Sequence, residues 1–300
     1  PEALDRDIAR IEGLGVRILT NTPVRDVAAL RQEYGAVLLS IGAHYAPALR
    51  IEGEKQAGVV SAIEFLRRVN SGERPAVGRH VMVVGGGNTA MDAARCARRL
   101  GAEVTIAYRR SRAEMPALAF EIEEAEREGV VLQELVNPVR ILGAEGKVTG
   151  VELVRQRLGE PDASGRRRPL PVEGSNYTVE ADTVILAIGQ LPDTSCLQGA
   201  VEVNRQGTIS YREDTLATSC EGVFASGDAA TGPRSAIEAV GMGHRAAESI
   251  HRYLSGEAVE LLPRIAPEQI VTLDRAEVSL WQAAGKVQMQ PRAEMPVRPV

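Results

Sequence analysis

The fold is decided by residues 80–90, HVMVVGGGNTA. An apolar run of strand type, Val81–Val84, leads directly into three glycines, and an Ala-rich segment of helical pattern, 88–100, follows them. A second apolar run, Val104–Ala107, comes at the distance that a strand–helix–strand unit needs. The glycines fit the pattern G-x-G-x-x-A, and this context predicts a Rossmann-like α/β unit with parallel strands.

Each position of this loop has a physical role in holding a dinucleotide. Gly85 permits the tight turn off the strand, Gly87 lets backbone approach a pyrophosphate, and Ala90 lets the helix pack on the sheet. The helix N-terminus offers unpaired N–H groups to the phosphates, and the side chains of Asn88 and Thr89 can add hydrogen bonds. The alternative is a glycine-rich turn without a ligand, and the strands on both sides make it the weaker interpretation.

The residues after the second strand indicate which nicotinamide dinucleotide binds. NAD sites place an acid about 20 residues after the glycine loop, whereas this chain has Tyr108-Arg109-Arg110-Ser111-Arg112 there. Because arginine pairs bidentately with phosphate, Arg109, Arg110 and Arg112 suit the 2′-phosphate of NADP. A solvated basic turn is the alternative. The sequence therefore predicts NADP in preference to NAD.

Length and composition describe an ordinary globular chain. Its 300 residues suffice for two domains, and 44% hydrophobic with 25% charged residues excludes a disordered or fibrous chain. The net charge of −5 argues against a large nucleic-acid-binding surface. The longest apolar run, Val184–Ile188, is far too short to span a membrane, and we find no signal-peptide pattern.

Cysteine and histidine placement gives no sign of a structural metal or a disulfide framework. The chain has three cysteines, Cys96, Cys196 and Cys220, and they are widely spaced. Its four histidines are scattered without ligand spacing. We therefore expect no metal site, and the free thiols point to the reducing cytoplasm.

A second candidate ligand site follows a later predicted strand, Gly222–Ala225. That strand runs into Gly227-Asp228, and a helix with a capping box, Ser235 with Glu238, begins shortly after it. An acid at a strand end can bind a sugar-like hydroxyl, and a helix N-terminus stabilises negative charge. A simple turn after the strand is an equally good interpretation of Asp228 taken alone.

Local patterns predict further elements toward the N-terminal side. Residues 16–19 and 36–41 have the apolar character of buried strands. Ser61 with Glu64 predicts the capping box of a helix. Another helix is expected from Pro116, which suits a first helical position, to Gly129 just past its end.

Beyond that helix, the pattern indicates β-structure and one long helix. Strands of a meander are expected at Val130–Leu135, Val148–Gln156 and Tyr177–Glu180. Between them, Gly159–Pro171 contains three consecutive arginines and is expected to be a solvated loop. The helix from Ser235 to Tyr253 is expected to bury the apolar face formed by Ile237, Val240, Ala247 and Ile250.

Several of these stretches resemble the signatures of flavoproteins with two dinucleotide-binding domains. Residues 223–228 (VFASGD) and 235–243 (SAIEAVGMG) are similar to the C-terminal FAD signature of that superfamily. Residues 37–42 (VLLSIG) and 185–190 (ILAIGQ) resemble its two crossover strands between the FAD and NAD(P) domains. The resemblance covers about residues 1–255.

Within that superfamily, the chain resembles the glutamate synthase small (beta) subunit. This resemblance is carried by residues 85–92 (GGGNTAMD) together with residues 108–116 (YRRSRAEMP). The family includes the related modules of dihydropyrimidine dehydrogenase and of NADH-dependent ferredoxin:NADP oxidoreductases.

The resemblance implies an NAD(P)-binding Rossmann-like domain inserted into an incomplete FAD-binding Rossmann-like domain. The implied division is residues 1–58 and 191–256 for the FAD-binding domain, 59–190 for the NAD(P)-binding domain, and 257–300 for an extended C-terminal tail. Beyond the glycine loop and the arginines, it implies cofactor contacts at Gly42, Gly189, Gly227, Asp228, Ser235, Ala236 and Ile237.

The implied function is an electron-input module. NADPH exchanges hydride with FAD, and single electrons then pass to iron–sulfur centres in the same chain or a partner, for use by a larger catalytic subunit. Since the cofactors carry this chemistry, we name no catalytic side chain. A ferredoxin:NADP oxidoreductase or pyrimidine reductase subunit is an alternative. An alternative of another class is a nucleotide-binding scaffold domain that has lost its flavin.

The sequence also departs from the family pattern. The family's first glycine motif, the acid that holds the FAD adenosine ribose and the cysteine-rich cluster-binding segment are all missing. We therefore expect these 300 residues to be an excised fragment that binds FAD weakly or not at all and is inactive alone.

Overall fold

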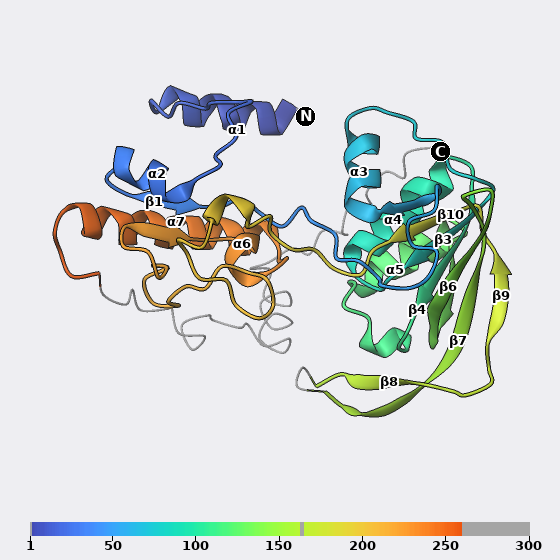
Figure 1. Ribbon diagram of the computed structural model, residues 1–300. Coiled ribbons are helices and arrows are strands. Elements are labelled where there is room, and N and C mark those ends of the chain that lie inside the picture. The colour runs from blue at the N-terminus through green and yellow to red at the C-terminus, as the bar shows by residue number, and fades with distance from the viewer. Residues whose placement is uncertain (1, 163–164, 260–300) are drawn as a thin grey trace, which may run out of the picture. The chain divides into compact units, whose positions relative to one another are not determined.

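The computed structural model describes residues 2–162 and 165–259, and its chain forms two compact units (Figure 1). One unit comprises Pro1–Ala43 and Leu191–Leu261, and the described part of the other is His44–Gln190. The second unit is thus inserted into the first. Its N-terminal boundary falls after Ala43, earlier than the residue 58 suggested by the sequence, and most of the expected tail at 257–300 lies outside the described residues.

The inserted unit is built on a five-stranded parallel sheet. The strand order is β2-β10-β3-β4-β5, and all neighbours are parallel. The strands are β2 (Val59–Ser61), β3 (His80–Val84), β4 (Glu103–Tyr108), β5 (Val131–Glu134) and β10 (Thr183–Leu186). This is the Rossmann-like arrangement that the glycine motif predicts, with β3 and β4 adjacent in it.

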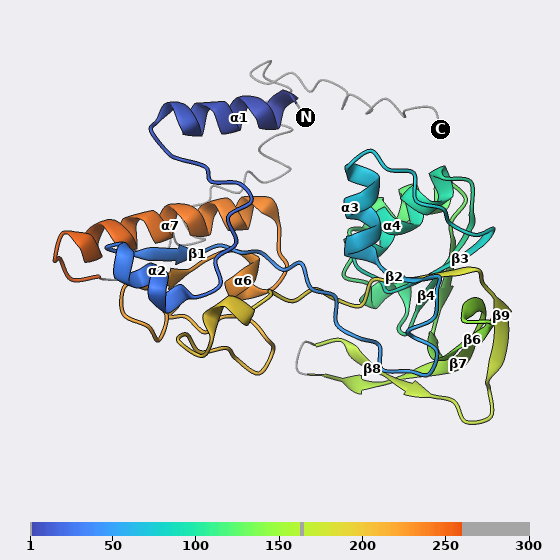
Figure 2. The same ribbon diagram turned by 45° about the horizontal axis from the view of Figure 1, so that its top comes forward.

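Two different layers cover the faces of this sheet (Figures 1 and 2). Helices α3 (Ala62–Asn70), α4 (Asn88–Arg99) and α5 (Ala119–Arg127) pack on one face. Val81 and Val83 point into this helix side, whereas Met82 and Val84 point to the opposite side. Because successive strand residues alternate between faces, a strand covered on both sides is apolar throughout, which explains the continuous apolar run of β3.

The opposite face is covered by an antiparallel sheet. Its strands are β6 (Val136–Ala144), β7 (Lys147–Pro161), β8 (Arg167–Pro171) and β9 (Tyr177–Glu180). The first half of β7 pairs with β6 and β9, and its second half extends as an arm that pairs with β8. The expectation of a loop at Gly159–Pro171 was therefore wrong, since most of its described residues belong to β7 and β8. The expected exposure to solvent is found at Arg167 and Arg168.

The meander prediction also needs one correction. The stretch Val130–Leu135 contains β5, which pairs in parallel with β4, Thr105 opposite Val131, and so belongs to the Rossmann-like sheet. The antiparallel strands begin only at Val136. The apolar pattern of β5 is the same in either sheet, and only the long-range pairing separates the two possibilities.

The other unit has a small parallel sheet with helices around it. Strand β1 (Val37–Leu39) pairs with β11 (Val223–Ala225), residues separated by the whole inserted unit. The remaining elements are α1 (Glu2–Gly13), α2 (Val27–Glu33), the short 3-10 helix η2 (Ser195–Leu197), α6 (Asp228–Thr231) and α7 (Ala236–Leu254). The buried strand expected at residues 16–19 is not formed, and these four residues are exposed.

Helix α7 begins as predicted but buries a different face. Ser235 and Glu238 form the full capping box. The buried residues are Ala246 and Ser249, whereas Ile237 is 76% and Val240 54% exposed. Phe224 on β11 contacts the ring of Tyr253 on α7, with the ring centroids 5.8 Å apart, so the buried face of the helix is not the one with the most apolar residues.

The contact between α4 and α5 is held by ion pairs. Arg95 and Arg99 on α4 donate hydrogen bonds to the carboxylate of Glu128, which follows α5 and is 15% exposed. Burial raises the pKa of Glu128, but the hydrogen bonds from Arg99 and Arg95 outweigh it, so the pKa lies below its ordinary value. The charged form of Glu128 therefore stabilises the folded state.

We expect Glu128→Gln to lower the free energy of unfolding by about 1 kcal/mol at neutral pH. Because the folded-state pKa is depressed, this advantage is full above about pH 4.5, the ordinary value, and is lost as pH falls through the folded-state pKa. Urea unfolding of the wild type and the variant, at neutral pH and at acid pH, measures this difference in the free energy of unfolding. Glu123→Gln, at an exposed position on α5, is the control, and a pH-independent difference in the free energy of unfolding would contradict the assignment.

Candidate functional site

The three glycines between β3 and α4 differ in what surrounds them. A Cβ on Gly85 would lie 2.3 Å from the carbonyl oxygen of Ala187, and Gly85 has a φ of +147°. A Cβ on Gly86 would lie 2.4 Å from the ring of Tyr108. At Gly87 the nearest atom would be 3.9 Å away. The first two glycines are therefore required by the protein's own packing, and only the third faces open space.

The open space at Gly87 lies at the N-terminus of α4. Gly87 is the N-cap residue of this helix and provides no side-chain hydrogen bond to it. No capping side chain therefore competes for the first N–H groups of α4, and these carry the positive end of the helix dipole. A bare backbone beside exposed N–H groups fits a pyrophosphate, the group that the sequence motif predicts.

Side chains near the loop already have partners within the protein. The Nε2 of Gln190 donates to the Oγ1 of Thr89 at 2.9 Å, and the N–H of Leu118 donates to the Oδ1 of Asn88 at 2.9 Å. Ala90 is fully buried under the loop. Thr89 and Asn88 each keep donor capacity, at the hydroxyl hydrogen and the amide nitrogen, so their predicted phosphate contacts remain chemically available.

Residues 108–118 brace the glycine loop, a feature that the sequence interpretation missed. The Tyr108 hydroxyl donates to the carbonyl oxygen of Glu114 at 2.8 Å. The N–H of Ala117 donates to the carbonyl oxygen of Gly86 at 3.1 Å. Residues 116–118 contact the loop and are not helical, so α5 starts at Ala119, whereas the sequence pattern predicts a start at Pro116. One sequence pattern could have predicted this local structure. It is the capping box formed by Ser111 and Glu114, with which the 3-10 helix η1 (Arg112–Glu114) begins.

The three arginines that follow β4 have different surroundings. Arg109 is exposed and makes no hydrogen bond or ion pair within the described residues. Arg110 is 5% exposed, and its guanidinium pairs with Asp162 at 2.7 Å. Arg112 pairs with Glu126 on α5 at 2.6 Å. Partial burial is the largest cause that lowers the pKa of Arg109, and the charge of Arg110 lowers it further, whereas Tyr108 and Asp162 act in the opposite direction.

The carboxylates near β4 are also occupied. Glu114 accepts a hydrogen bond from the N–H of Ser111, and Glu134 accepts one from the N–H of Arg112 at 2.5 Å. Both carboxylates are thus engaged by the protein's own backbone, and neither is directed toward a ribose hydroxyl by a pattern that the sequence predicts. This matches the lack of an acid in the sequence at the place where NAD sites have one.

The other predicted contact residues divide between the two units. Gly189 follows β10 in the inserted unit. Its neighbour Gln190 donates a hydrogen bond to Thr89 of the glycine loop. Gly42 and Gly227, with φ of +68° and +63°, belong to the other unit and use backbone conformations that favour glycine.

In that unit, Asp228 starts α6 shortly after β11. Its Oδ1 accepts a hydrogen bond from the N–H of Arg234 at 3.2 Å, which ties the strand end to the residues before α7. Ser235, Ala236 and Ile237 are exposed at the start of α7. An acid and an exposed helix N-terminus thus occur together, as the sequence suggested.

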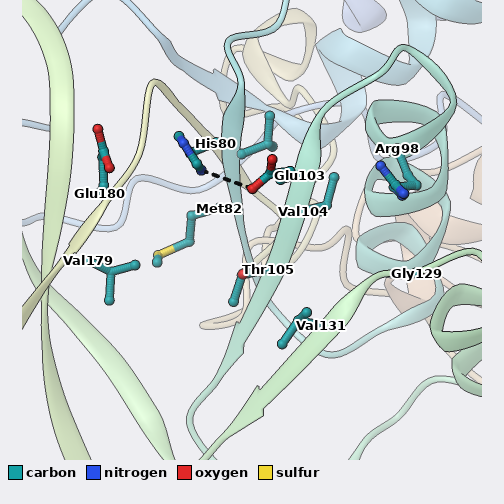
Figure 3. Close-up of a pocket in the computed structure, with 11 residues that line it drawn as sticks. His80, Met82, Arg98, Glu103, Val104, Thr105, Gly129, Val131, Val179 and Glu180 are labelled. Atoms are coloured by element: carbon teal, nitrogen blue, oxygen red, sulfur yellow. Dashed lines mark ion pairs between the residues drawn. The ribbon is translucent and has the colours of Figure 1, made fainter.

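A separate cavity of about 350 Å³ lies at the amino ends of β3 and β4 (Figure 3). It is lined in part by His80 and Glu103, whose side chains are 3.6 Å apart. Met82 and Val131 line its apolar part. The glycine loop follows the opposite, carboxyl end of β3, so this cavity is distinct from the dinucleotide site.

Metal-binding and membrane-spanning features are absent from residues 2–162 and 165–259. No three or more His, Cys, Asp or Glu side chains there are grouped to hold a metal ion. The three cysteines are free thiols. None of the helices in these ranges has both the length and the apolar character needed to cross a bilayer.

Comparisons with known proteins agree with this architecture. The chain is 48% identical over 260 residues to the NADP(+)-dependent formate dehydrogenase subunit beta of Moorella thermoacetica, covering 84% of this chain and 37% of that protein. It is 38% identical to the glutamate synthase [NADPH] small chain of Escherichia coli, covering 84% of this chain and 58% of the relative. The chain thus spans less than two thirds of each.

A solved structure has the same fold at low identity. FprA of Mycobacterium tuberculosis, determined in complex with NADPH, superimposes with a TM-score of 0.65 at 17% identity, over 90% of this chain and 70% of FprA. The family model for pyridine nucleotide-disulphide oxidoreductases matches residues 5–243. Fold, glycine loop and sequence similarity agree: the chain belongs to the pyridine nucleotide-disulphide oxidoreductase family, among relatives that include the glutamate synthase small chain.

Proposed function

We propose that this chain docks NADPH at residues 85–90 and serves as the electron-input module of a flavoprotein oxidoreductase. The observation that carries the proposal is the contrast within the glycine loop. Gly85 and Gly86 are filled by the protein's own atoms, whereas Gly87 leaves open space at the N-terminus of a 12-residue helix. A diphosphate bridge is the group that such an anion-binding cradle suits.

We propose NADP over NAD because of the residues that follow β4. Arg109 is exposed and positioned one residue beyond Tyr108, whose ring lies under Gly86. A guanidinium there can pair with the 2′-phosphate, the group that NAD lacks. The names of two relatives, an NADP(+)-dependent formate dehydrogenase subunit and an NADPH-dependent glutamate synthase chain, support the same choice.

We further propose FAD as the second cofactor, which supplies the hydride acceptor when bound. Asp228 is suited to a ligand hydroxyl, and the exposed start of α7 at Ser235, Ala236 and Ile237 to negative charge. Gly42 of this unit and Gly189 of the inserted unit are the remaining predicted cofactor contacts. Because the chain contains a single glycine loop of the dinucleotide type, FAD retention by residues 1–300 is expected to be weak.

The destination of the electrons is part of the same proposal. Relatives named as a subunit beta and a small chain support partner subunits, to which electrons would pass through iron–sulfur centres. A ferredoxin:NADP oxidoreductase or pyrimidine reductase would use the same module with another final acceptor. A scaffold without flavin is less consistent with the combination of Asp228 and the α7 N-terminus. The cytoplasm is the proposed location.

Dye reduction by the full-length protein tests this function. We expect NADPH to be preferred to NADH, and Arg109→Ala to lower kcat/KM for NADPH about tenfold with little effect for NADH, because only NADPH carries the 2′-phosphate. Arg79→Ala, which removes a charge at the opposite end of the sheet, is the matched control. Equal use of both nucleotides by the wild type, or no effect of Arg109→Ala and Arg110→Ala, would contradict the assignment.

A further inference from the structure

A hydrogen bond joins the segment that follows β10 to the first turn of α4. The Nε2 of Gln190 donates to the Oγ1 of Thr89 at 2.9 Å, and both residues are half-buried. Strands β10 and β3 are parallel neighbours, with Leu186 opposite Val84, so the segments that follow them leave the sheet at the same edge (Figure 1). Both residues belong to the inserted unit, and the contact lies within one compact unit.

The order of the strands places this contact at the edge where a ligand is expected. From β3 the chain continues to β4 and β5 on one side, and it later returns to β10 on the other side of β3. Open parallel sheets bind their ligands at such a reversal of strand order, in the crevice outside the carboxyl ends of the strands. The Gln190–Thr89 hydrogen bond thus lies at the edge where the glycine loop would hold a diphosphate.

This hydrogen bond determines what the Thr89 hydroxyl can offer to a ligand. A threonine hydroxyl has one proton to donate and two lone pairs that accept. Because the amide nitrogen of Gln190 can only donate, it occupies a lone pair of Oγ1 and leaves the proton of Thr89 for another acceptor. Among the described residues, no protein group accepts a hydrogen bond from this hydroxyl. The proton is therefore available to a ligand.

Asn88 has the same arrangement one residue earlier. The backbone N–H of Leu118 donates to its Oδ1 at 2.9 Å, which orients the amide so that Nδ2 is the group that remains. The backbone N–H groups of Asn88 and Thr89 also meet no protein acceptor in the part of the chain that the structure describes. The start of α4 thus combines backbone and side-chain donors, which suits a ligand that only accepts, such as an ionised diphosphate.

We propose that Gln190 is a positioning residue of the dinucleotide site, whose amide holds the Thr89 hydroxyl as a donor to the diphosphate of NADP. This rests on the proposed function, since the diphosphate is that of the nucleotide docked at residues 85–90. Gln190 acts through Thr89 and not by touching the nucleotide. Without the amide, the hydroxyl can turn its proton away, and its hydrogen bond to the diphosphate weakens.

Titration calorimetry of the full-length protein with NADP tests this role. Gln190→Met keeps the length of the side chain and removes its donor, whereas Thr89→Val keeps the shape and removes the hydroxyl. We expect Thr89→Val to weaken NADP binding about tenfold, as for the loss of one hydrogen bond to a charged group, and Gln190→Met about threefold. The double variant should bind no more weakly than Thr89→Val, because Gln190 acts only through that hydroxyl.

Two controls separate positioning from a general loss of structure. Adenosine 2′-phosphate lacks the diphosphate, so its affinity should not change in Gln190→Met, whereas a loosened unit would bind both ligands more weakly. Gln133→Met removes another amide-to-hydroxyl hydrogen bond of the same unit, from Gln133 on β5 to Tyr177 on β9 at 2.6 Å, and should leave the NADP affinity unchanged.

Three results would overturn the role of Gln190. They are additive losses in the double variant, equal losses for NADP and adenosine 2′-phosphate, and an NADP affinity that is no lower in Gln190→Met than in Gln133→Met. If the wild-type protein binds no NADP, the proposed function itself fails, whereas NADP binding that does not depend on Gln190 leaves that function standing.

Discussion

Replacing Gly87 with alanine is expected to weaken NADP binding about 10- to 100-fold without unfolding the protein. A Cβ at this position meets protein only at 3.9 Å, and the backbone angles, φ −93° and ψ 175°, suit any residue. The methyl group would instead fill the space where backbone should approach the pyrophosphate. Steric overpacking of this kind costs about 1–3 kcal/mol, which sets the expected loss of affinity.

Calorimetric titration with NADP and thermal unfolding measure the two effects separately. Gly13→Ala is the control, because alanine there also meets open space but lies far along the chain at the end of α1. Unchanged affinity in a folded Gly87→Ala variant would show that the ligand does not approach this backbone, and the proposed site would fall.

The same substitution two residues earlier is expected to have the opposite result. Gly85→Ala should lower the free energy of unfolding by about 3–5 kcal/mol, enough to unfold a marginal domain. The added Cβ would lie 2.3 Å from the carbonyl oxygen of Ala187, whose own N–H donates to the carbonyl oxygen of Val84 at 2.8 Å. This backbone is held in the sheet and cannot move away, and the φ of +147° adds strain.

Gly101→Ala separates the two contributions. Gly101 has a φ of +102°, but a Cβ added there would meet nothing within 4 Å, so alanine carries the strain without the clash. Urea unfolding should rank Gly85→Ala well below Gly101→Ala in stability, with Gly87→Ala near the wild type. If both variants lost the same free energy of unfolding, the backbone at Ala187 would have shifted to accept the Cβ. Packing would then not require glycine at position 85.

Local sequence determined the elements whose signals are complete within a short window. The apolar strand, three glycines and Ala-rich helix of residues 80–100 specify one strand–turn–helix unit, and the fold contains it as β3, the loop and α4. Ser61 and Ser235 cap helices as predicted because capping involves only neighbouring residues. The three arginines after β4 predict a preference for the 2′-phosphate of NADP, and this stays a prediction.

Tertiary structure decided everything that depends on distant partners. Residues 16–19 have the composition of a strand, yet no strand forms there, while β5 belongs to the parallel sheet and not to the expected meander. Arg110 was indistinguishable from Arg109 in sequence, whereas in the structure Arg110 is buried against Asp162 and the carbonyl oxygen of Arg167, and Arg109 is exposed. Strand pairing and burial are set by long-range contacts whose free energy no local pattern contains.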